Sequence, residues 1–168
     1  MITIRPAATH DHDAIWSIIK PVIQAGDTYM YAPESTREQM LDIWFTPGKF
    51  SYVAEWEEQV AGTFFICANQ PGLGAHVANA GYMVHPNYRG HGIAQAMCRF
   101  SLDEARRLGF KAMQFNAVVS TNTVAIKLWE RFGFTRIGTV PKAYQHSTLG
   151  LVDTYVMYQW LLVDHTTS

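Results

Sequence analysis

The sequence is poor in cysteine, in charge bias and in long apolar runs, and each shortage narrows the classes of protein that fit. Its two cysteines, Cys67 and Cys98, lie far apart and match no CxxC or zinc-ligand spacing, and their apolar surroundings predict buried, unreactive thiols. No stretch approaches the roughly 18 uninterrupted apolar residues of a membrane-spanning helix. The 13 basic and 14 acidic residues leave a net charge of −1, so the basic face of a dedicated nucleic-acid-binding protein is not indicated.

The residues that are present fit one globular domain. The chain has 168 residues, of which 48% are apolar, and both values are ordinary for a protein of one domain. The first residues do not form the basic and then apolar pattern of a signal peptide. We therefore expect a cytoplasmic protein with a single domain over residues 1–163 and a frayed tail over residues 164–168.

Hydrophobic periodicity predicts an alternation of strands and helices along this domain. We expect strands at residues 3–5, 50–56, 60–68, 77–84, 111–119, 134–140 and 151–162. Helices are expected after Asp11, from Ser35, from Ile93 and from Thr123, and Pro21 is expected to kink the first of them or to end it early. This order indicates an α/β (α+β) domain with one mixed sheet of about seven strands and about four flanking helices.

Two finer expectations concern the ends and surfaces of these helices. Ser35 and Glu38 have the spacing of a capping box at the start of the second helix. Asp103 and Arg107 lie four residues apart on the polar face of the third helix, where opposite charges pair.

The segment at residues 84–94 carries the clearest chemical signal. A predicted strand leads into a turn of small residues, and an amphipathic helix begins at once. Backbone N–H groups at a helix start have no partner within the helix, and the helix dipole adds about half a positive charge there. Gly90 and Gly92 remove side chains that would keep a diphosphate away from those N–H groups, and Arg89 adds a positive charge. Together these residues predict a site for the pyrophosphate of a nucleotide.

Other phosphate-binding motifs fit this segment less well. The motif GxxxxGK[ST] is not present, because the pair Gly48-Lys49 lacks both the upstream glycine and the following Ser or Thr. Only two glycines of GxGxxG are present, which weakens a dinucleotide interpretation. On spacing alone, an ordinary tight turn between strand and helix remains the alternative.

Two blocks of the sequence resemble the GCN5-related N-acetyltransferase (GNAT) family. The first is Arg89-Gly90-His91-Gly92-Ile93-Ala94, which fits the family's R/Q-x-x-G-x-G/A signature. The second, residues 122–134 (NTVAIKLWERFGF), is similar to the family's N-x-x-A-x-x-L-Y-E-x-x-G-F helix. The blocks follow each other in the family's order. The segment from Pro141 to Asp153 also resembles small-molecule acetyltransferases related to phosphinothricin N-acetyltransferase.

The resemblance implies binding of acetyl-CoA and transfer of its acetyl group to an amine, without a metal. In this family the first block holds the pyrophosphate, and the strand before it aligns the pantetheine arm in a gap beside the strand at residues 111–119. A backbone N–H of that strand, here of Val84, would stabilise the negative charge on the thioester oxygen. The residues expected to contact acetyl-CoA are Met83, Val84, Arg89, Gly90, His91, Gly92, Ile93, Ala94 and Asn122.

The resemblance leaves the proton donor open. Trp129 stands where many members of the family have a tyrosine, and an indole cannot act as a general acid at neutral pH. Tyr144, Tyr88 or a water would have to protonate the leaving thiolate instead. Asn122 is expected near the thioester. Asn116 would bond the acceptor or the thioester, or would only satisfy neighbouring backbone.

The base that takes the proton of the amine is also open. Glu34 and Glu38 lie in or beside the loop that covers the acceptor in similar enzymes, and helix capping or solvation is their alternative role. The same loop holds Asp27, Tyr29 and Tyr31. Three histidines could titrate near neutral pH, namely His76, His85 and His146. The run His10-Asp11-His12-Asp13 is ligand-like, but it falls where the first helix needs a cap, so no metal is expected.

We therefore expect an N-acetyltransferase that acts on a small primary or secondary amine of the amino-acid, amino-acid-analogue or polyamine class. It is expected to be a homodimer and to bind neither nucleic acid nor membrane. One alternative is a CoA-binding module of the same fold with little activity, which Trp129 favours. The other is an acetyltransferase of proteins or peptides, to which the weak charge bias lends no support.

Overall fold

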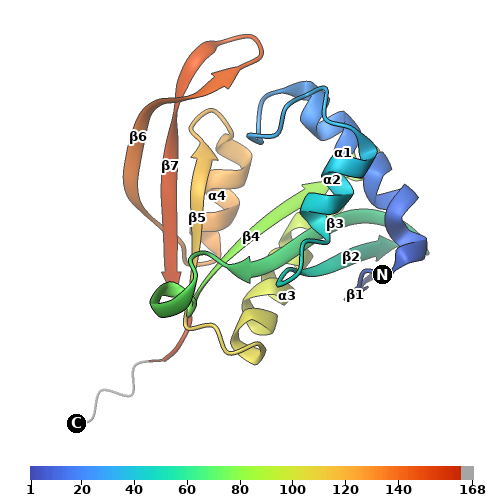
Figure 1. Cartoon of the computed structure of the whole chain (residues 1–168), viewed down its shortest axis with the longest axis horizontal. Coiled ribbons are helices and arrows are strands. Elements are labelled where there is room, and N and C mark those ends of the chain that lie inside the picture. The colour runs from blue at the N-terminus through green and yellow to red at the C-terminus, as the bar shows by residue number, and fades with distance from the viewer. Residues whose placement is uncertain (164–168) are drawn as a thin grey trace.

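The computed structural model describes residues 1–163, which form one seven-stranded mixed sheet with helices on both faces (Figure 1). The strands are β1 (Ile2–Pro6), β2 (Phe50–Trp56), β3 (Gln59–Ala68), β4 (Val77–Val84), β5 (Ala112–Val119), β6 (Thr135–His146) and β7 (Gly150–Trp160), in the spatial order β1-β2-β3-β4-β5-β7-β6. The helices are α1 (His12–Ala25), α2 (Arg37–Trp44), α3 (Ile93–Arg107) and α4 (Thr123–Arg131). The predicted fold class is confirmed, and the expected tail at 164–168 lies outside the described residues. Within residues 1–163, no helix combines the length and the apolar character needed to cross a membrane.

Two hydrophobic clusters attach the helices to opposite faces of the sheet. Because alternate residues of a strand point to opposite faces, Phe65 of β3 belongs to one cluster and Phe64 to the other. The cluster around Phe65 holds α1 and α2, through buried residues that include Ile15, Ile18, Ile19, Met40 and Trp44. The cluster around Phe64 holds α3 and α4, through Met97, Cys98, Leu102, Ile126 and Trp129. Each large apolar side chain buried in this way contributes roughly 2 kcal/mol.

Two glycines allow close approach between elements near the centre of the sheet. A Cβ on Gly62 would lie 2.9 Å from the Ile93 side chain, so glycine lets the start of α3 pack directly on β3. A Cβ on Gly81 would lie 2.8 Å from the ring of Phe65, so glycine makes room for that ring against β4. Both contacts lie close to residues 84–94, the segment with the clearest chemical signal in the sequence.

Three local expectations were wrong. Pro21 does not end α1 early, and the helix continues to Ala25, because the isoleucines and valines on both sides of the proline are buried in one cluster. The cap of α2 is Thr36, whose side chain accepts from the Gln39 N–H, and not Ser35. Arg107 bonds Glu104 at 2.6 Å, three residues before it, and not Asp103.

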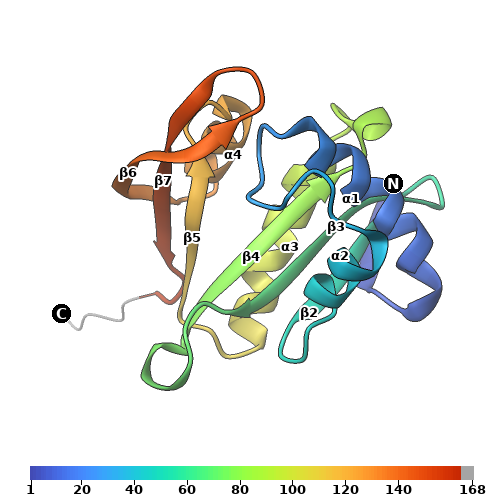
Figure 2. The ribbon, with the colours of Figure 1, turned by 45° about the horizontal axis from the view of Figure 1, so that its top comes forward.

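Strands β4 and β5 separate after a short pairing, and this splay positions the site. They are parallel and pair only at Val77–Ala112 and Ala78–Met113. Beyond these pairs β4 stays with β3, whereas β5 stays with β7, with an irregular register between Phe115 and Val118. The two strands therefore form a V that is open toward the end of β4 (Figure 2).

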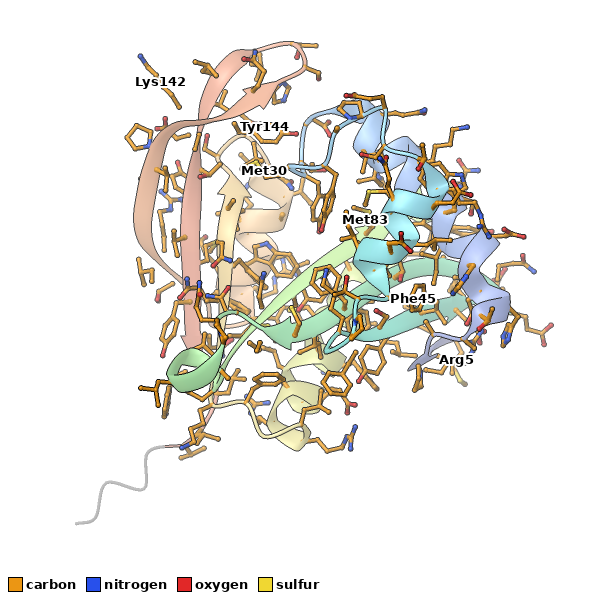
Figure 3. The ribbon with its side chains drawn as sticks, in the orientation of Figure 1. Arg5, Met30, Phe45, Met83, Lys142 and Tyr144 are labelled. Carbon is orange, nitrogen blue, oxygen red and sulfur yellow. The ribbon has the colours of Figure 1, made fainter. Side chains whose placement is uncertain are left out.

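The loop between α1 and α2 lies at the open end of the V, and the β6–β7 hairpin holds it there. Gly26 ends α1 with φ of 61°, and its carbonyl accepts from the Ser147 N–H at 2.9 Å. The Tyr144 hydroxyl donates to the Tyr29 carbonyl at 3.0 Å. Met30 of the loop and Tyr144 of β6 lie near each other in Figure 3, between the hairpin and the loop. Residues 26–36, the loop to which the family resemblance assigns the acceptor, are called the acceptor loop below.

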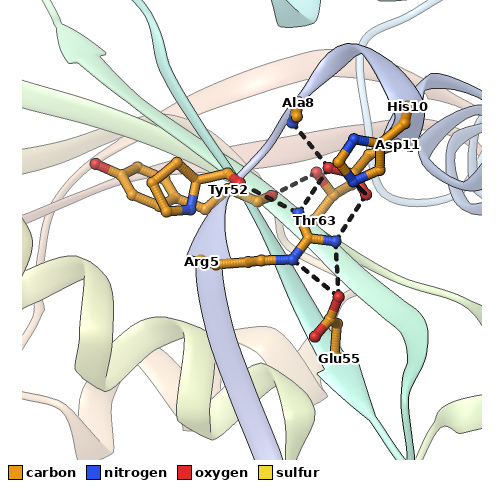
Figure 4. A network of polar contacts seen from close by, with 8 residues as sticks. Arg5, Ala8, His10, Asp11, Tyr52, Glu55 and Thr63 are labelled. Carbon is orange, nitrogen blue, oxygen red and sulfur yellow. Dashed lines mark hydrogen bonds and ion pairs between the residues drawn. The ribbon is translucent and has the colours of Figure 1, made fainter.

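A buried carboxylate fastens the first strand to the start of α1 (Figure 4). Asp11 is 2% exposed and accepts from the Arg5 guanidinium at 2.8 Å and from the Ala8 N–H at 2.8 Å. The same guanidinium bonds Glu55 of β2 at 2.7 Å. Hydrogen bonding to Arg5 lowers the pKa of Asp11 to about 2. The ligand-like run around Asp11 thus serves the fold, and residues 1–163 contain no group of three His, Cys, Asp or Glu side chains arranged to hold a metal.

Candidate active site

A cavity of about 560 Å³ runs through the gap between β4 and β5. On the α3 and α4 face it is lined by Arg89, Ala94, Asn122, Val124, Ala125, Leu128 and Trp129. On the α1 and α2 face it is lined by Val22, residues 27–31 of the acceptor loop, Phe65 and Met83. Residues 79–84 and 115–119 of the two splayed strands form its walls. The cavity therefore connects the two faces of the sheet, so that two molecules entering from opposite faces can meet in it.

The turn between β4 and α3 is open toward solvent, as an anion site requires. Gly90 and Gly92 have φ of 82° and 78°, a left-handed backbone that favours glycine, and no atom lies within 4 Å of a Cβ built on either. Gly92 is the N-cap of α3 and offers no side chain to the N–H groups of the first turn. Those amides are therefore available for an anion, in a fold where Arg89 lines the adjoining cavity.

The other residues of this turn have different placements. Ile93 is buried and packs on β3, so only its backbone can face the turn. The His91 ring stacks on the Trp56 ring with centroids 4.2 Å apart, which fixes the side of the turn that faces β2. Ala94, Met83 and Val84 line the cavity directly.

The backbone of β4 presents every second peptide group to the gap. The His85 N–H donates to the Ala61 carbonyl of β3 at 2.9 Å, so the backbone groups of the odd-numbered residues of β4 bond β3. In an antiparallel ladder the intervening residues point their N–H and C=O groups the other way. The peptide groups of Tyr82 and Val84 therefore face the gap, at a level where β5 no longer pairs with β4.

Tyr29 of the acceptor loop reaches into this gap. The Tyr82 N–H donates to the Tyr29 hydroxyl at 2.8 Å, and that hydroxyl donates in turn to the Tyr82 carbonyl. One phenol thus bonds the two backbone groups that a neighbouring strand would bond. Burial raises the pKa of Tyr29 far above its usual value, so the phenol keeps its proton at neutral pH.

Asn122 and Trp129 lie on the α4 side of the cavity. Asn122 is the N-cap of α4, and its Oδ1 accepts from the Ala125 N–H at 3.3 Å. This bond leaves the amide NH₂ end as the donor that can face a ligand. Trp129 is 8% exposed and packs against Tyr82 and Phe115, with ring centroids 5.0 and 4.8 Å away. It is a wall of the cavity and part of the core.

The remaining predicted catalytic residues are more dispersed. Asn116 lines the cavity, where its Nδ2 donates to Asn69 at 2.7 Å and its Oδ1 accepts from Gln114. Tyr144 does not line the cavity, and its hydroxyl is committed to the acceptor loop. Glu34 is exposed and lies outside the cavity lining.

Two of the candidate histidines bond their own turns. The Nδ1 of His85 accepts from the Asn87 N–H at 3.2 Å. The Nδ1 of His146 accepts from the Thr148 N–H at 3.1 Å. Neither ring, nor that of His76, lines the cavity.

Sequence reasoning missed two features of the site. The role of the Tyr29 hydroxyl depends on Tyr82, a residue 53 positions away, and only the aromatic richness of the loop pointed to it. Asp27 lines the cavity, whereas Glu34, the residue selected from the same loop, does not.

The known proteins that resemble this chain include N-acetyltransferases. The Acetyltransferase (GNAT) family matches residues 15–134. N-acetyltransferase aca1 of Schizosaccharomyces pombe is 33% identical over 155 residues, which cover 82% of this chain and 74% of that protein. L-amino acid N-acetyltransferase AaaT of Escherichia coli is 29% identical over 160 residues, which cover 93% of this chain and 96% of that protein.

Solved structures share the whole fold. A GCN5-related N-acetyltransferase from Kribbella flavida superimposes with a TM-score of 0.90 at 44% identity, over 95% of this chain and 97% of the other. The yncA protein of Salmonella typhimurium, solved with its cofactor acetyl-CoA, has a TM-score of 0.84 at 22% identity, over 100% and 98% of the two chains. A structure assigned provisionally to phosphinothricin N-acetyltransferases has a TM-score of 0.85 at 21% identity, over 97% and 100%. The last two show the fold alone.

The family match spans most of the chain and includes both sequence blocks that border the β4–β5 gap. The chain therefore belongs to the Acetyltransferase (GNAT) family and is an acetyl-CoA-dependent N-acetyltransferase.

Proposed function

We propose that this N-acetyltransferase transfers the acetyl group of acetyl-CoA to a small-molecule amine by direct attack of the amine on the thioester. The observation that carries the proposal is the cavity through the β4–β5 gap, which has lining residues on both faces of the sheet. The acceptor side is covered by a loop that is bonded at Gly26 and Tyr29 to the last hairpin. The acceptor would share this cavity of about 560 Å³ with the end of the cofactor arm, which favours a small molecule. The likeness to AaaT, an L-amino acid N-acetyltransferase, supports the same acceptor size.

Acetyl-CoA would enter from the α3 and α4 face. The N–H groups at residues 90–94 and the Arg89 guanidinium would hold its pyrophosphate, and Asn122 would bond the pantetheine arm. The arm would then extend along β4 and bond the gap-facing peptide groups of Val84 and Tyr82. Because the Tyr29 hydroxyl now bonds Tyr82, the arm and Tyr29 compete for that peptide group.

The chemistry needs three aids that this chain can supply. An N–H of β4, from Val84 or Tyr82, would stabilise the oxygen that becomes negative when nitrogen attacks the thioester carbon. Asp27, the one carboxylate among the described cavity residues, would accept the proton of the amine, directly or through water. The C–S bond then breaks and the thiolate takes a proton. The Tyr29 phenol lines the same cavity and, once released from Tyr82, would donate that proton, a role that the Trp129 indole cannot fill.

The thiolate formed by transfer gives a direct test. We expect release of free thiol from acetyl-CoA that depends on both the enzyme and a small amine, with the acetylated amine detected by mass spectrometry. Acetyl-CoA should also raise the melting temperature, because ligand at 100 times its Kd stabilises the folded protein by about 2.7 kcal/mol. ATP and NAD should not raise it. Activity on peptide N-termini with none on small amines would contradict the proposal.

We further propose a homodimer and a cytoplasmic location. Strands β6 and β7 expose apolar side chains suited to a subunit contact, among them Ile137, Val140, Leu151 and Trp160. The two free cysteines fit a reducing compartment. Light scattering would find twice the 19.0 kDa chain mass for a dimer, and cell fractionation would test the location.

A further inference from the structure

We propose that the acceptor is a monoamine with an apolar, preferably aromatic, body and no carboxylate beside the amine. The inference rests on the proposed function, because it concerns the acceptor half of the same cavity. Of the acceptor classes expected from the sequence, it disfavours free amino acids and polyamines.

The charges of the cavity are few and are separated. Among the described residues that line it, only Asp27 and Arg89 carry a full charge. Arg89 adjoins the glycine turn before α3, whereas Asp27 belongs to the acceptor loop on the other face of the sheet. The acceptor half is therefore negative, with no cation on its described surface.

Lys49, a cation beside the Phe65 wall of the cavity, is already engaged. The Lys49 Nζ lies 4.1 Å from the centroid of the Phe65 ring and donates to the Ile43 carbonyl at 2.8 Å. Burial lowers the pKa of Lys49, and its side chain does not line the cavity. The carboxylate of an amino acid would thus find no positive partner here and would lie in the field of Asp27.

The walls of the acceptor half favour an apolar body. Tyr29 and Tyr31 stack with ring centroids 5.9 Å apart and planes at 12°, and Phe65 and Met83 form the facing wall. Met30, which is 52% exposed, is a flexible apolar side chain at the mouth. One carboxylate can pair one ammonium, so a polyamine would leave its further ammonium groups without partners.

Three compounds with the same phenyl body separate the effect of the carboxylate. We expect kcat/KM for phenethylamine to exceed that for L-phenylalanine by at least about tenfold, with L-phenylalaninamide closer to phenethylamine. The amine of phenethylamine is at least as basic as that of phenylalanine, so a larger neutral fraction cannot explain its advantage. Putrescine should be a poorer acceptor than phenethylamine. L-Phenylalanine or putrescine turning over as well as phenethylamine would overturn the inference and leave the proposed function intact.

A charge reversal tests which residue causes the preference. Asp27→Lys removes the proposed base and should lower kcat/KM for both amines, but far more for phenethylamine than for L-phenylalanine, so that their ratio falls by about tenfold or more. Asp42→Lys makes the same change on the exposed surface of α2, outside the cavity lining, and should leave the ratio unchanged. A ratio that Asp27→Lys does not alter would overturn the assignment to Asp27. No thiol release with any of the three phenyl compounds or putrescine, in a protein that acetyl-CoA still stabilises, would contradict the proposed function itself.

Discussion

The two ends of the cavity are built in different ways. The turn between β4 and α3 is local, since its shape depends on glycines at residues 90 and 92 and on the helix that follows. The acceptor loop also depends on distant residues that hold it, among them Ser147 and Tyr144 of the last hairpin. The comparison teaches that the cofactor end is encoded by adjacent residues, whereas the acceptor end depends on tertiary contacts.

The largest expected effect on stability is far from both ends, at the start of α1. The pKa of Asp11 falls from 3.8 to about 2 on folding, which corresponds to about 2 kcal/mol of stability. Because that pKa is lowered, the stabilisation is full above about pH 4 and is lost as the pH falls toward 2. Asp11→Asn should lower the free energy of unfolding by about 2 kcal/mol at pH 7 and by much less near pH 2, as measured by urea denaturation.

This variant sharpens the comparison because its stability effect should leave both Michaelis constants unchanged. Asp13→Asn is the matched control, since Asp13 forms an exposed pair with Arg37 and should change stability by under about 0.5 kcal/mol. An altered KM in Asp11→Asn would mean that general destabilisation reaches the site.

The next effect concerns Tyr29, where the two ends meet. Tyr29→Phe removes the hydroxyl that bonds the Tyr82 N–H and C=O, so the free protein should lose about 1–2 kcal/mol. Acetyl-CoA can then bond the vacated peptide groups without competition. We expect a larger rise in melting temperature on adding acetyl-CoA than in the wild type. An equal or smaller rise would show that the arm does not use the Tyr82 peptide group.

Gly92→Val should separate the cofactor end from the acceptor end. A β-branched side chain at φ of 78° strains the turn and covers the amides, so KM for acetyl-CoA should rise about tenfold with KM for the amine little changed. Gly109→Val is the control, because Gly109 has φ of 93° and open space at the other end of α3. Equal kinetics for the two variants would remove the turn from cofactor binding.

The smallest effect is expected at the acceptor end. Tyr144→Phe removes the hydrogen bond to the Tyr29 carbonyl and loosens the loop, so KM for the amine should rise about three- to fivefold. KM for acetyl-CoA should stay constant. Tyr158→Phe, on the neighbouring strand β7, serves as the control. A change in KM for acetyl-CoA alone, with KM for the amine unchanged, would contradict the roles assigned to the two ends of the cavity.

Much of the fold follows from local pattern, and the errors in its prediction arise where tertiary packing decides. The strand at residues 77–84 was predicted with its observed bounds, since its apolar run is delimited by turn residues. Ser35 and Thr36 both begin a capping-box spacing. Burial of Met40 and Trp44 against the sheet is consistent with the second, and short-range pattern does not reveal that choice. Pro21 stays within α1 because tertiary packing outweighs its lost hydrogen bond.

The site divides in the same way. The glycine turn and Asn122 are predicted from the sequence because adjacent residues define them. The bond between Tyr144 and Tyr29 spans 115 positions, and no local pattern indicates it. Glu34 and Asp27 lie in one loop with similar composition around them, and only the course of the folded chain places Asp27 on the cavity.

A crystal structure of the wild-type protein with acetyl-CoA tests the central claim most directly. The account predicts the pyrophosphate on the backbone amides of residues 90–94, the pantetheine arm between β4 and β5, and the Tyr29 hydroxyl released from Tyr82. A pyrophosphate bound elsewhere, or a β4–β5 gap still filled by Tyr29 with the arm outside it, would contradict the account.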